Sequence, residues 1–113
     1  MKTKDFSLKS NFFDLIARGR KRTEFRDATN NYYTQTFVNV DSYNGKSIND
    51  VTKGLLDGTL KPRWNELTHI RFHCMGRTML VEVKGIRLER ESKVYAIDLG
   101  KVLTGKRKEN VPE

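Results

Sequence analysis

GRKRTEFRD, residues 19–27, is the stretch in which the chain changes from a helical to a strand pattern, and it decides the expected fold. Before it, Phe12, Leu15 and Ile16 follow the i, i+3, i+4 spacing of one apolar helical face. Gly19 is the residue type that commonly ends a helix in the left-handed conformation. The spacing therefore predicts an N-terminal helix that ends at this glycine.

Beyond the helix stop the residues alternate with a period of two, which is typical of a strand. The alternation places Arg22, Glu24 and Arg26 on one face. Thr23 and Phe25 lie on the opposite face, and we expect Phe25 to point into the core.

Caps and turn residues divide the middle of the chain. Residues 32–41 are rich in aromatic and β-branched side chains, which indicates one or two strands. Ser47, with Asp50 three residues later, is typical of a helix N-terminus, and Gly58 is a suitable stop. A short connecting helix is therefore expected between Ser47 and Gly58.

Strand patterns dominate the second half of the chain. Residues 67–74 and 77–88 form two β-like runs about a turn at Met75 and Gly76, and residues 94–99 indicate a final short strand. Consecutive strands bury one face by curling into a barrel. The predicted fold is α+β and mainly β, a small β-barrel of five to six strands with an N-terminal helix and a short connecting helix.

The length of 113 residues permits one domain with a single modest core. We assign this domain to residues 1–103, because residues 104–113 lack apolar periodicity and are expected to form a disordered tail. No run of about eighteen apolar residues occurs, and the N-terminal residues lack the apolar stretch of a signal peptide. We therefore expect a cytoplasmic protein without a membrane partner, and we take it to be a monomer.

The net charge is +8, from 22 Lys and Arg against 14 Asp and Glu. A field of this sign attracts polyanions, so nucleic acid is the leading partner class. Charge alone leaves RNA, DNA, nucleotides and acidic proteins open as partners.

Metal and cofactor sites are not predicted. Cys74 has no second cysteine, and we expect it to be a small buried apolar residue. His69 and His73 share one face of an expected strand, but the strand rise separates them by roughly 13 Å, too far to ligate one metal ion.

A cation, a carboxylate and a guanidinium gather around the predicted turn. Arg26 is able to bind a phosphate or a carbonyl edge bidentately, Lys21 is a mobile point charge, and Glu24 is able to accept from the amino group of a base. Tyr33 offers an aromatic ring for stacking. The alternative interpretation is a surface ladder of ion pairs beside a helix C-terminus.

Residues 19–26 also match the G-x-K-x-x-E-x-R signature of the ASCH domain family, a branch of the PUA-like fold. The preceding apolar helix and the later strands resemble the same family, so the resemblance covers roughly residues 8–103. The resemblance implies a small β-barrel with a cleft between the first helix and the barrel, which binds RNA or a modified nucleoside. It also implies that Lys21, Glu24 and Arg26 line this cleft and that Gly19 shapes its turn.

Some members that resemble this chain are enzymes, which cut RNA or cleave the acetyl amide of N4-acetylcytidine. In the amidohydrolases a threonine at the position of Glu24 is the proposed nucleophile, and the lysine that matches Lys21 activates it. This sequence departs from that pattern, because it has a glutamate there and no late helix that supplies a further glutamate.

Two hypotheses follow from the residues and the resemblance. In the first, the chain binds RNA or a modified nucleoside through a set of six residues: Gly19, Arg20, Lys21, Glu24, Arg26 and Tyr33. In the second, it is a hydrolase acting on RNA or on an acylated nucleoside such as N4-acetylcytidine, with Lys21 as base and Glu24 as acid/base partner. A third interpretation is an adaptor whose basic surface binds an acidic protein.

Overall fold

The structure, a computed structural model, describes residues 1–104. Of the predicted tail, only Thr104 falls in this range, as the last residue of a strand; the rest lies outside the described residues. The chain divides into two compact units. Unit 1 comprises Met1–Glu24, Leu67–Gly85 and the chain from Asp98 onward, and unit 2 comprises Phe25–Glu66 and Ile86–Ile97.

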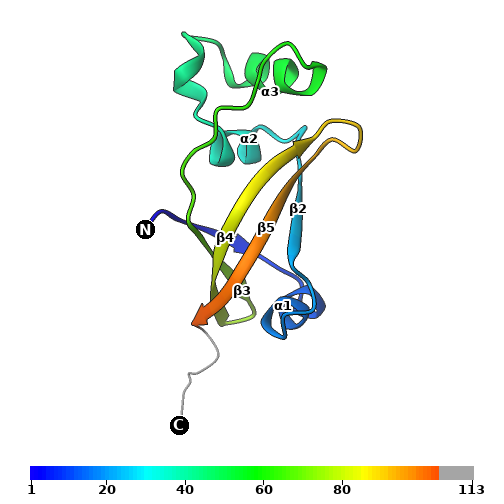
Figure 1. Cartoon of the computed structure of the whole chain (residues 1–113), viewed down its shortest axis with the longest axis vertical. Coiled ribbons are helices and arrows are strands. Elements are labelled where there is room, and N and C mark those ends of the chain that lie inside the picture. The colour runs from blue at the N-terminus through cyan, green and yellow to red at the C-terminus, as the bar shows by residue number, and fades with distance from the viewer. Residues whose placement is uncertain (105–113) are drawn as a thin grey trace. The chain divides into compact units, whose positions relative to one another are not determined.

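Strands make up most of the regular structure, together with three α-helices and one 3-10 helix. Along the described chain the elements are β1 (Thr3–Ser7), α1 (Ser10–Ala17), β2 (Thr23–Asp27), α2 (Asn31–Phe37), η1 (Val40–Tyr43), α3 (Ile48–Asp57), β3 (His69–Cys74), β4 (Arg77–Glu89) and β5 (Val94–Thr104). The five strands form one half-barrel sheet in the order β1-β3-β4-β5-β2 (Figure 1). The predicted α+β, mainly β class with an N-terminal and a connecting helix is therefore confirmed.

In unit 1, α1 ends at Gly19 as the sequence predicts. Gly19 has a φ of 72°, its N–H donates to the Ile16 carbonyl at 2.9 Å, and the Arg20 N–H donates to the Leu15 carbonyl at 2.9 Å. This pair of hydrogen bonds is the Schellman motif, which satisfies carbonyl groups that the helix end leaves without partners.

The buried face of α1 differs from the predicted one. Phe13 and Ile16 are buried, whereas Phe12 and Leu15 are exposed. Phe13 and Ile16, three residues apart, therefore form the face of α1 that packs into the core, and only Ile16 belongs to the predicted set. Arg77 lies over the ring of Phe13, with 4.4 Å between the guanidinium carbon and the ring centroid.

The expectation that Phe25 points into the core is wrong. The Phe25 side chain is 52% exposed, while Glu24 is only 6% exposed, so the inward and outward faces of β2 are exchanged relative to the prediction. Glu24 tolerates this burial because Lys21 forms an ion pair with it. The prediction failed because the alternation of side chains along a strand does not reveal which of its two faces is buried.

A parallel strand pair that the sequence did not predict lies at one edge of the sheet. β1 pairs with β3, and Phe6 stands opposite Phe72 in the register; both rings are buried. Burying each ring contributes about 1.5–3 kcal/mol. The short β1 was missed because its strand pairing joins residues that are 66 positions apart.

The predicted turn between β3 and β4 is confirmed. Met75 and Gly76 both have positive φ, 49° and 81°, as a type I′ hairpin turn requires. β5 is longer than predicted and continues to Thr104.

In unit 2, the strands predicted for residues 32–41 are wrong, because this segment forms α2 and η1. The Asn30 side chain accepts from the Tyr32 N–H at 2.9 Å and caps the helix. Thr34 and Phe37 then share a buried face. Tertiary burial of this face outweighs the β propensity of the aromatic and β-branched residues.

The connecting helix α3 is confirmed with its predicted signals. The Ser47 hydroxyl accepts from the Asp50 N–H at 3.1 Å, and Gly58 has a φ of 85°. Arg90, on the turn between β4 and β5, donates to the Leu55 carbonyl at 2.8 Å and so joins this turn to α3 within unit 2.

Tyr95 is the centre of the unit 2 core. Its ring makes edge contacts with Phe37 and Trp64, at centroid distances of 5.3 and 6.1 Å, and its hydroxyl bonds to the Thr34 hydroxyl at 2.6 Å. Burial raises the pKa of Tyr95 above its usual value. The hydroxyl therefore remains a neutral group that needs its Thr34 partner.

Two buried threonines of unit 2 provide a matched test of hydrogen bonding in the core. Among the described residues, the hydroxyl of Thr52 has no hydrogen-bond partner, whereas that of Thr34 is paired. We expect Thr52→Val to raise the free energy of unfolding by about 1 kcal/mol and Thr34→Val to lower it by about 1–3 kcal/mol. Urea unfolding measures both, and equal losses in the two variants would contradict the assignment.

The edge pair in unit 1 predicts a pH dependence of stability. The pKa of Asp5 lies below its usual value, chiefly because His73 bonds to it at 2.7 Å, and also because of the positive charges of His73 and Arg71. The pKa of Asp5 is lower in the folded protein than in the unfolded chain, where it is near 3.8, so the charged carboxylate stabilises the fold at pH values above 3.8. This stabilisation is lost as the pH falls from 3.8 toward the pKa of the folded protein.

We therefore expect Asp5→Asn to lower the free energy of unfolding by about 0.2–1 kcal/mol at neutral pH, and to have no effect in strong acid. Urea unfolding at both pH values measures the difference. Glu91→Gln removes an exposed carboxylate elsewhere and is the control. An equal effect of Asp5→Asn at both pH values would exclude the carboxylate as the cause.

Candidate functional site

A hollow of about 470 Å³ lies within unit 1, between the turn after α1 and the paired strands β4 and β5. We call it the basic pocket. Its described lining includes five cationic side chains and one carboxylate, Glu82. The cationic residues are Arg18, Lys21, Arg22, Lys84 and Lys101.

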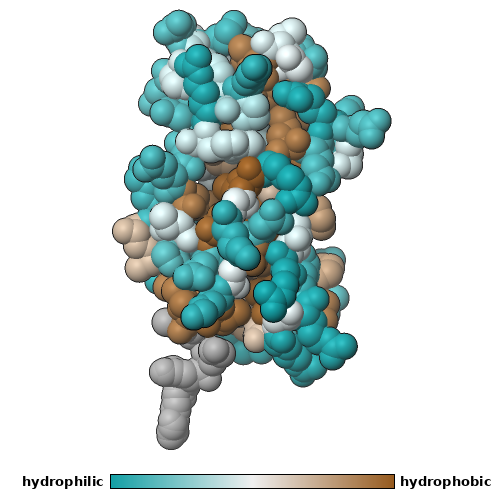
Figure 2. All heavy atoms as spheres, viewed as in Figure 1, coloured by the Kyte–Doolittle hydropathy of each residue, from teal (hydrophilic) through white to brown (hydrophobic). Residues whose placement is uncertain are grey.

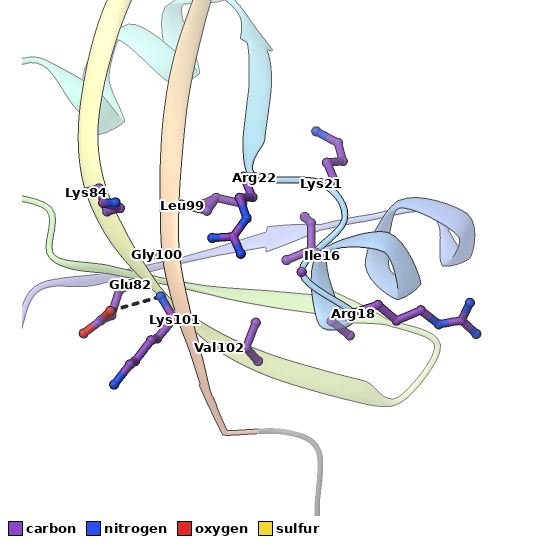
Figure 3. A pocket seen from close by; sticks show the side chains of 12 residues that line it. Ile16, Arg18, Lys21, Arg22, Glu82, Lys84, Leu99, Gly100, Lys101 and Val102 are labelled. Carbon is purple, nitrogen blue, oxygen red and sulfur yellow. Dashed lines mark hydrogen bonds between the residues drawn. The ribbon is translucent and has the colours of Figure 1, made fainter.

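Arg22 points into the basic pocket (Figure 3). Figure 3 shows its guanidinium between Ile16 on one side and Leu99 with Gly100 on the other, whereas Arg18 and Lys21 extend away from the centre. The Arg22 carbonyl accepts from the Leu99 N–H at 2.9 Å, so its backbone is joined to β5. A fixed backbone limits where the guanidinium can move.

Glu82 and Gly100 shape the sheet side of the basic pocket. A Glu82 carboxylate oxygen accepts from the Lys101 N–H at 3.0 Å, so this carboxylate is already engaged with the backbone (Figure 3). A Cβ at position 100 would lie 3.0 Å from the same carboxylate and 3.2 Å from the Lys84 Cγ. Glycine therefore keeps this part of the pocket open.

Apolar side chains also line the basic pocket: Ile16, Ala17, Leu99 and Val102. A surface that combines guanidinium and ammonium groups with an apolar wall suits an anion that also has an uncharged face. Figure 2 shows hydrophilic side chains over much of the drawn face, with hydrophobic residues in patches between them.

Lys21 and Glu24 form a close ion pair at the border of the basic pocket. The Lys21 ammonium lies 3.0 Å from a Glu24 carboxylate oxygen, and their side chains are 19% and 8% exposed. Lys21 also donates to the Thr23 carbonyl and lies 5.7 Å from the Phe12 ring centroid. The structure therefore brings together the two residues predicted as a catalytic pair.

Arg26 and Tyr33 form a second cluster, which belongs to unit 2. The Arg26 guanidinium donates to the Tyr33 hydroxyl at 3.0 Å and lies 5.5 Å from the centroid of its ring. Tyr32 meets Tyr33 edge-on at 5.3 Å and is 58% exposed. Tyr33 is half-buried and also stacks on Phe37 at 6.2 Å, so the exposed ring of Tyr32 is the one in this cluster that is available for stacking on a base.

The predicted site residues thus fall into separate groups. Gly19 and Lys21 line the basic pocket, Glu24 is joined to it through Lys21, and Arg20 is not among its lining residues. Arg26 and Tyr33 pair with each other.

The predicted set of binding residues did not include three cations that line the basic pocket: Arg22, Lys84 and Lys101. Arg22 occupies a variable position of the signature, so the motif gave it no role. The sequence did contain one sign of the sheet side of this pocket. Glu82 and Lys84 alternate along β4, and Gly100 on the neighbouring β5 has no side chain to cover them.

The described part of the chain comprises residues 1–104. Within this part of the chain, no three His, Cys, Asp or Glu side chains gather as potential metal ligands. No helix there is both long enough and apolar enough to cross a lipid bilayer.

Comparison of the chain with known protein families, with curated proteins and with solved structures found no match.

Proposed function

We propose that the chain binds RNA or a modified nucleoside at the basic pocket. The observation that carries this proposal is the ratio of charges there, five cationic side chains to one carboxylate among the described lining residues. The carboxylate already accepts a backbone hydrogen bond, so the pocket as a whole attracts anions.

Each group at the basic pocket has a role in this proposal. The Arg22 guanidinium binds two phosphate oxygens through parallel N–H bonds, and Lys84 and Lys101 contribute point charges beside it. The wall formed by Leu99 and Val102 then contacts the sugar or the base. The phosphate contacts recognise the nucleic-acid backbone and do not distinguish one base sequence from another.

The resemblance to the ASCH family supports the same location. We propose membership of this family, because Gly19 and Lys21 of its signature line the basic pocket beside α1. Glu24, held by Lys21, offers an acceptor for a base amino group. In unit 2 the exposed ring of Tyr32, next to the Arg26–Tyr33 pair, offers a stacking surface. We further propose that the protein is cytoplasmic and acts as a monomer, as binding of one RNA segment needs no second copy.

Removing a cation from the basic pocket tests this function. We expect Arg22→Ala, Lys84→Ala and Lys101→Ala each to weaken binding of a short single-stranded RNA, and to reduce the slope of log K against log salt concentration by about 0.7 per lost phosphate contact. Fluorescence anisotropy across a salt series measures both quantities.

Lys4→Ala is the matched control, because Lys4 is an exposed cation of β1 outside the basic pocket. Its loss changes the net charge equally. If Lys4→Ala weakens binding as much as Lys84→Ala, the general field of the protein explains the affinity and the pocket has no special role. Binding of an acidic protein that survives nuclease treatment would instead favour the adaptor.

The contact between Lys21 and Glu24 favours hydrolysis as a second candidate function. Both side chains are largely covered, and they lie at the border of a pocket that is able to hold an acylated nucleoside or RNA. In this candidate Lys21 is the base toward water and Glu24 is its acid/base partner. The Thr23 hydroxyl donates to an Asp98 carboxylate oxygen at 3.4 Å and takes no part in this candidate reaction.

Incubation with N4-acetylcytidine and with labelled RNA separates the two functions. We expect retained RNA binding and no deacetylated or shortened product, because both polar groups of the pair already have partners in each other. Product that disappears in a Lys21→Met, Glu24→Gln double variant would establish the hydrolase. The double variant is needed because Lys21→Met alone would break a largely buried ion pair, and breaking such a pair from one side costs about 3–5 kcal/mol.

A further inference from the structure

A second hollow, of about 430 Å³, lies wholly within unit 2. We call it the amide pocket. Its polar lining consists of three carboxamides and one carboxylate: Gln35, Asn39, Asn65 and Asp41. Val38, Val40 and Ile48 form its apolar wall. The volume falls within the usual range for small-molecule sites, about 300–1,000 Å³.

Asn65 is the most firmly fixed polar group of the amide pocket. Its N–H donates to the Phe37 carbonyl at 2.9 Å. Its side-chain NH₂ donates to the carbonyls of Thr36 at 3.0 Å and Val38 at 3.2 Å. Both side-chain donors are therefore used, and the carboxamide oxygen remains as an acceptor in a set orientation.

The other polar groups are available to a ligand. Within residues 1–104, the side chains of Gln35, Asn39 and Asp41 have no hydrogen-bond or ion-pair partner. The backbone beneath them is nevertheless fixed, because the Asn39 N–H donates to the Arg63 carbonyl at 2.7 Å and η1 begins at the next residue. The pocket thus offers unused donors and acceptors on an ordered frame.

The charge of the amide pocket is opposite to that of the basic pocket. Of its described lining residues, Asp41 alone is charged, although the protein as a whole carries a net charge of +8. A phosphate would be repelled by this carboxylate. The site therefore selects a neutral group that is rich in N–H donors and has a flat apolar face.

We propose that the amide pocket binds an unpaired guanine base. Guanine presents two adjacent donors, N1–H and the N2 amino group, which match the two oxygens of the Asp41 carboxylate. The carboxamide NH₂ groups of Gln35 and Asn39 donate to the O6 and N7 acceptors of the same base. Adenine and cytosine lack this adjacent pair of donors, and uracil has a single N–H.

The base must be unpaired, because base pairing occupies the edge that carries N1 and N2. The branched side chains of Val40 and Ile48 offer the ring an apolar contact, whereas Val38 beneath them is almost fully buried. The inference rests on unit 2 alone and does not require the basic pocket to bind RNA.

Titration of the full chain with neutral nucleosides tests the proposal separately from the basic pocket, because a nucleoside has no phosphate. We expect guanosine to shift the side-chain NH₂ signals of Gln35, Asn39 and Asn65 in NMR spectra, with little dependence on salt. Inosine lacks the N2 amino group and should bind about tenfold more weakly.

Asp41→Asn should weaken guanosine binding by at least about tenfold, and Gln35→Ala by several fold. Glu66→Gln is the matched control, because Glu66 is an exposed carboxylate of unit 2 that does not line the amide pocket. Circular dichroism verifies that each variant folds. Equal binding of guanosine, inosine and adenosine would overturn the proposal, as would equal effects of Asp41→Asn and Glu66→Gln, or no shifts up to the solubility limit of guanosine.

Discussion

The two backbone hydrogen bonds that close α1 at Gly19 determine the geometry of the basic pocket. They require a positive φ at Gly19, a conformation that a residue with a Cβ adopts at a cost of roughly 1–2 kcal/mol. Because the helix ends at this glycine, Lys21 and Arg22 follow it directly, and the Arg22 carbonyl accepts from the Leu99 N–H of β5. A longer connection would remove the guanidinium from the pocket that it enters.

Local signals predicted the elements whose boundaries depend on one or two residues. Ser47, Gly58 and the pair Met75-Gly76 act through their own backbone or through hydrogen bonds within four residues, so the sequence identifies them directly. The class of the fold follows from these boundaries, because they leave mainly strand-like segments between them.

The errors arise where distant residues decide the outcome. The segment of α2 has strand-like composition, yet burial against Tyr95 selects the helix that Asn30 caps. Glu24 occupies the covered face of β2 because Lys21 neutralises it, which alternation alone does not reveal. The candidate site shows the same division. The signature located Gly19 and Lys21, but Lys84 and Lys101 join the pocket through strand pairing.

The parallel pairing of β1 with β3 has a consequence for synthesis on the ribosome. Phe6 reaches its partner Phe72 only after a further 66 residues have been added to the chain. At about 5–20 residues per second, β1 waits roughly 3–13 s for a neighbour. During this interval the apolar ring and the backbone groups of β1 have no partner strand, so this segment is exposed to chaperones and water until β3 has been made.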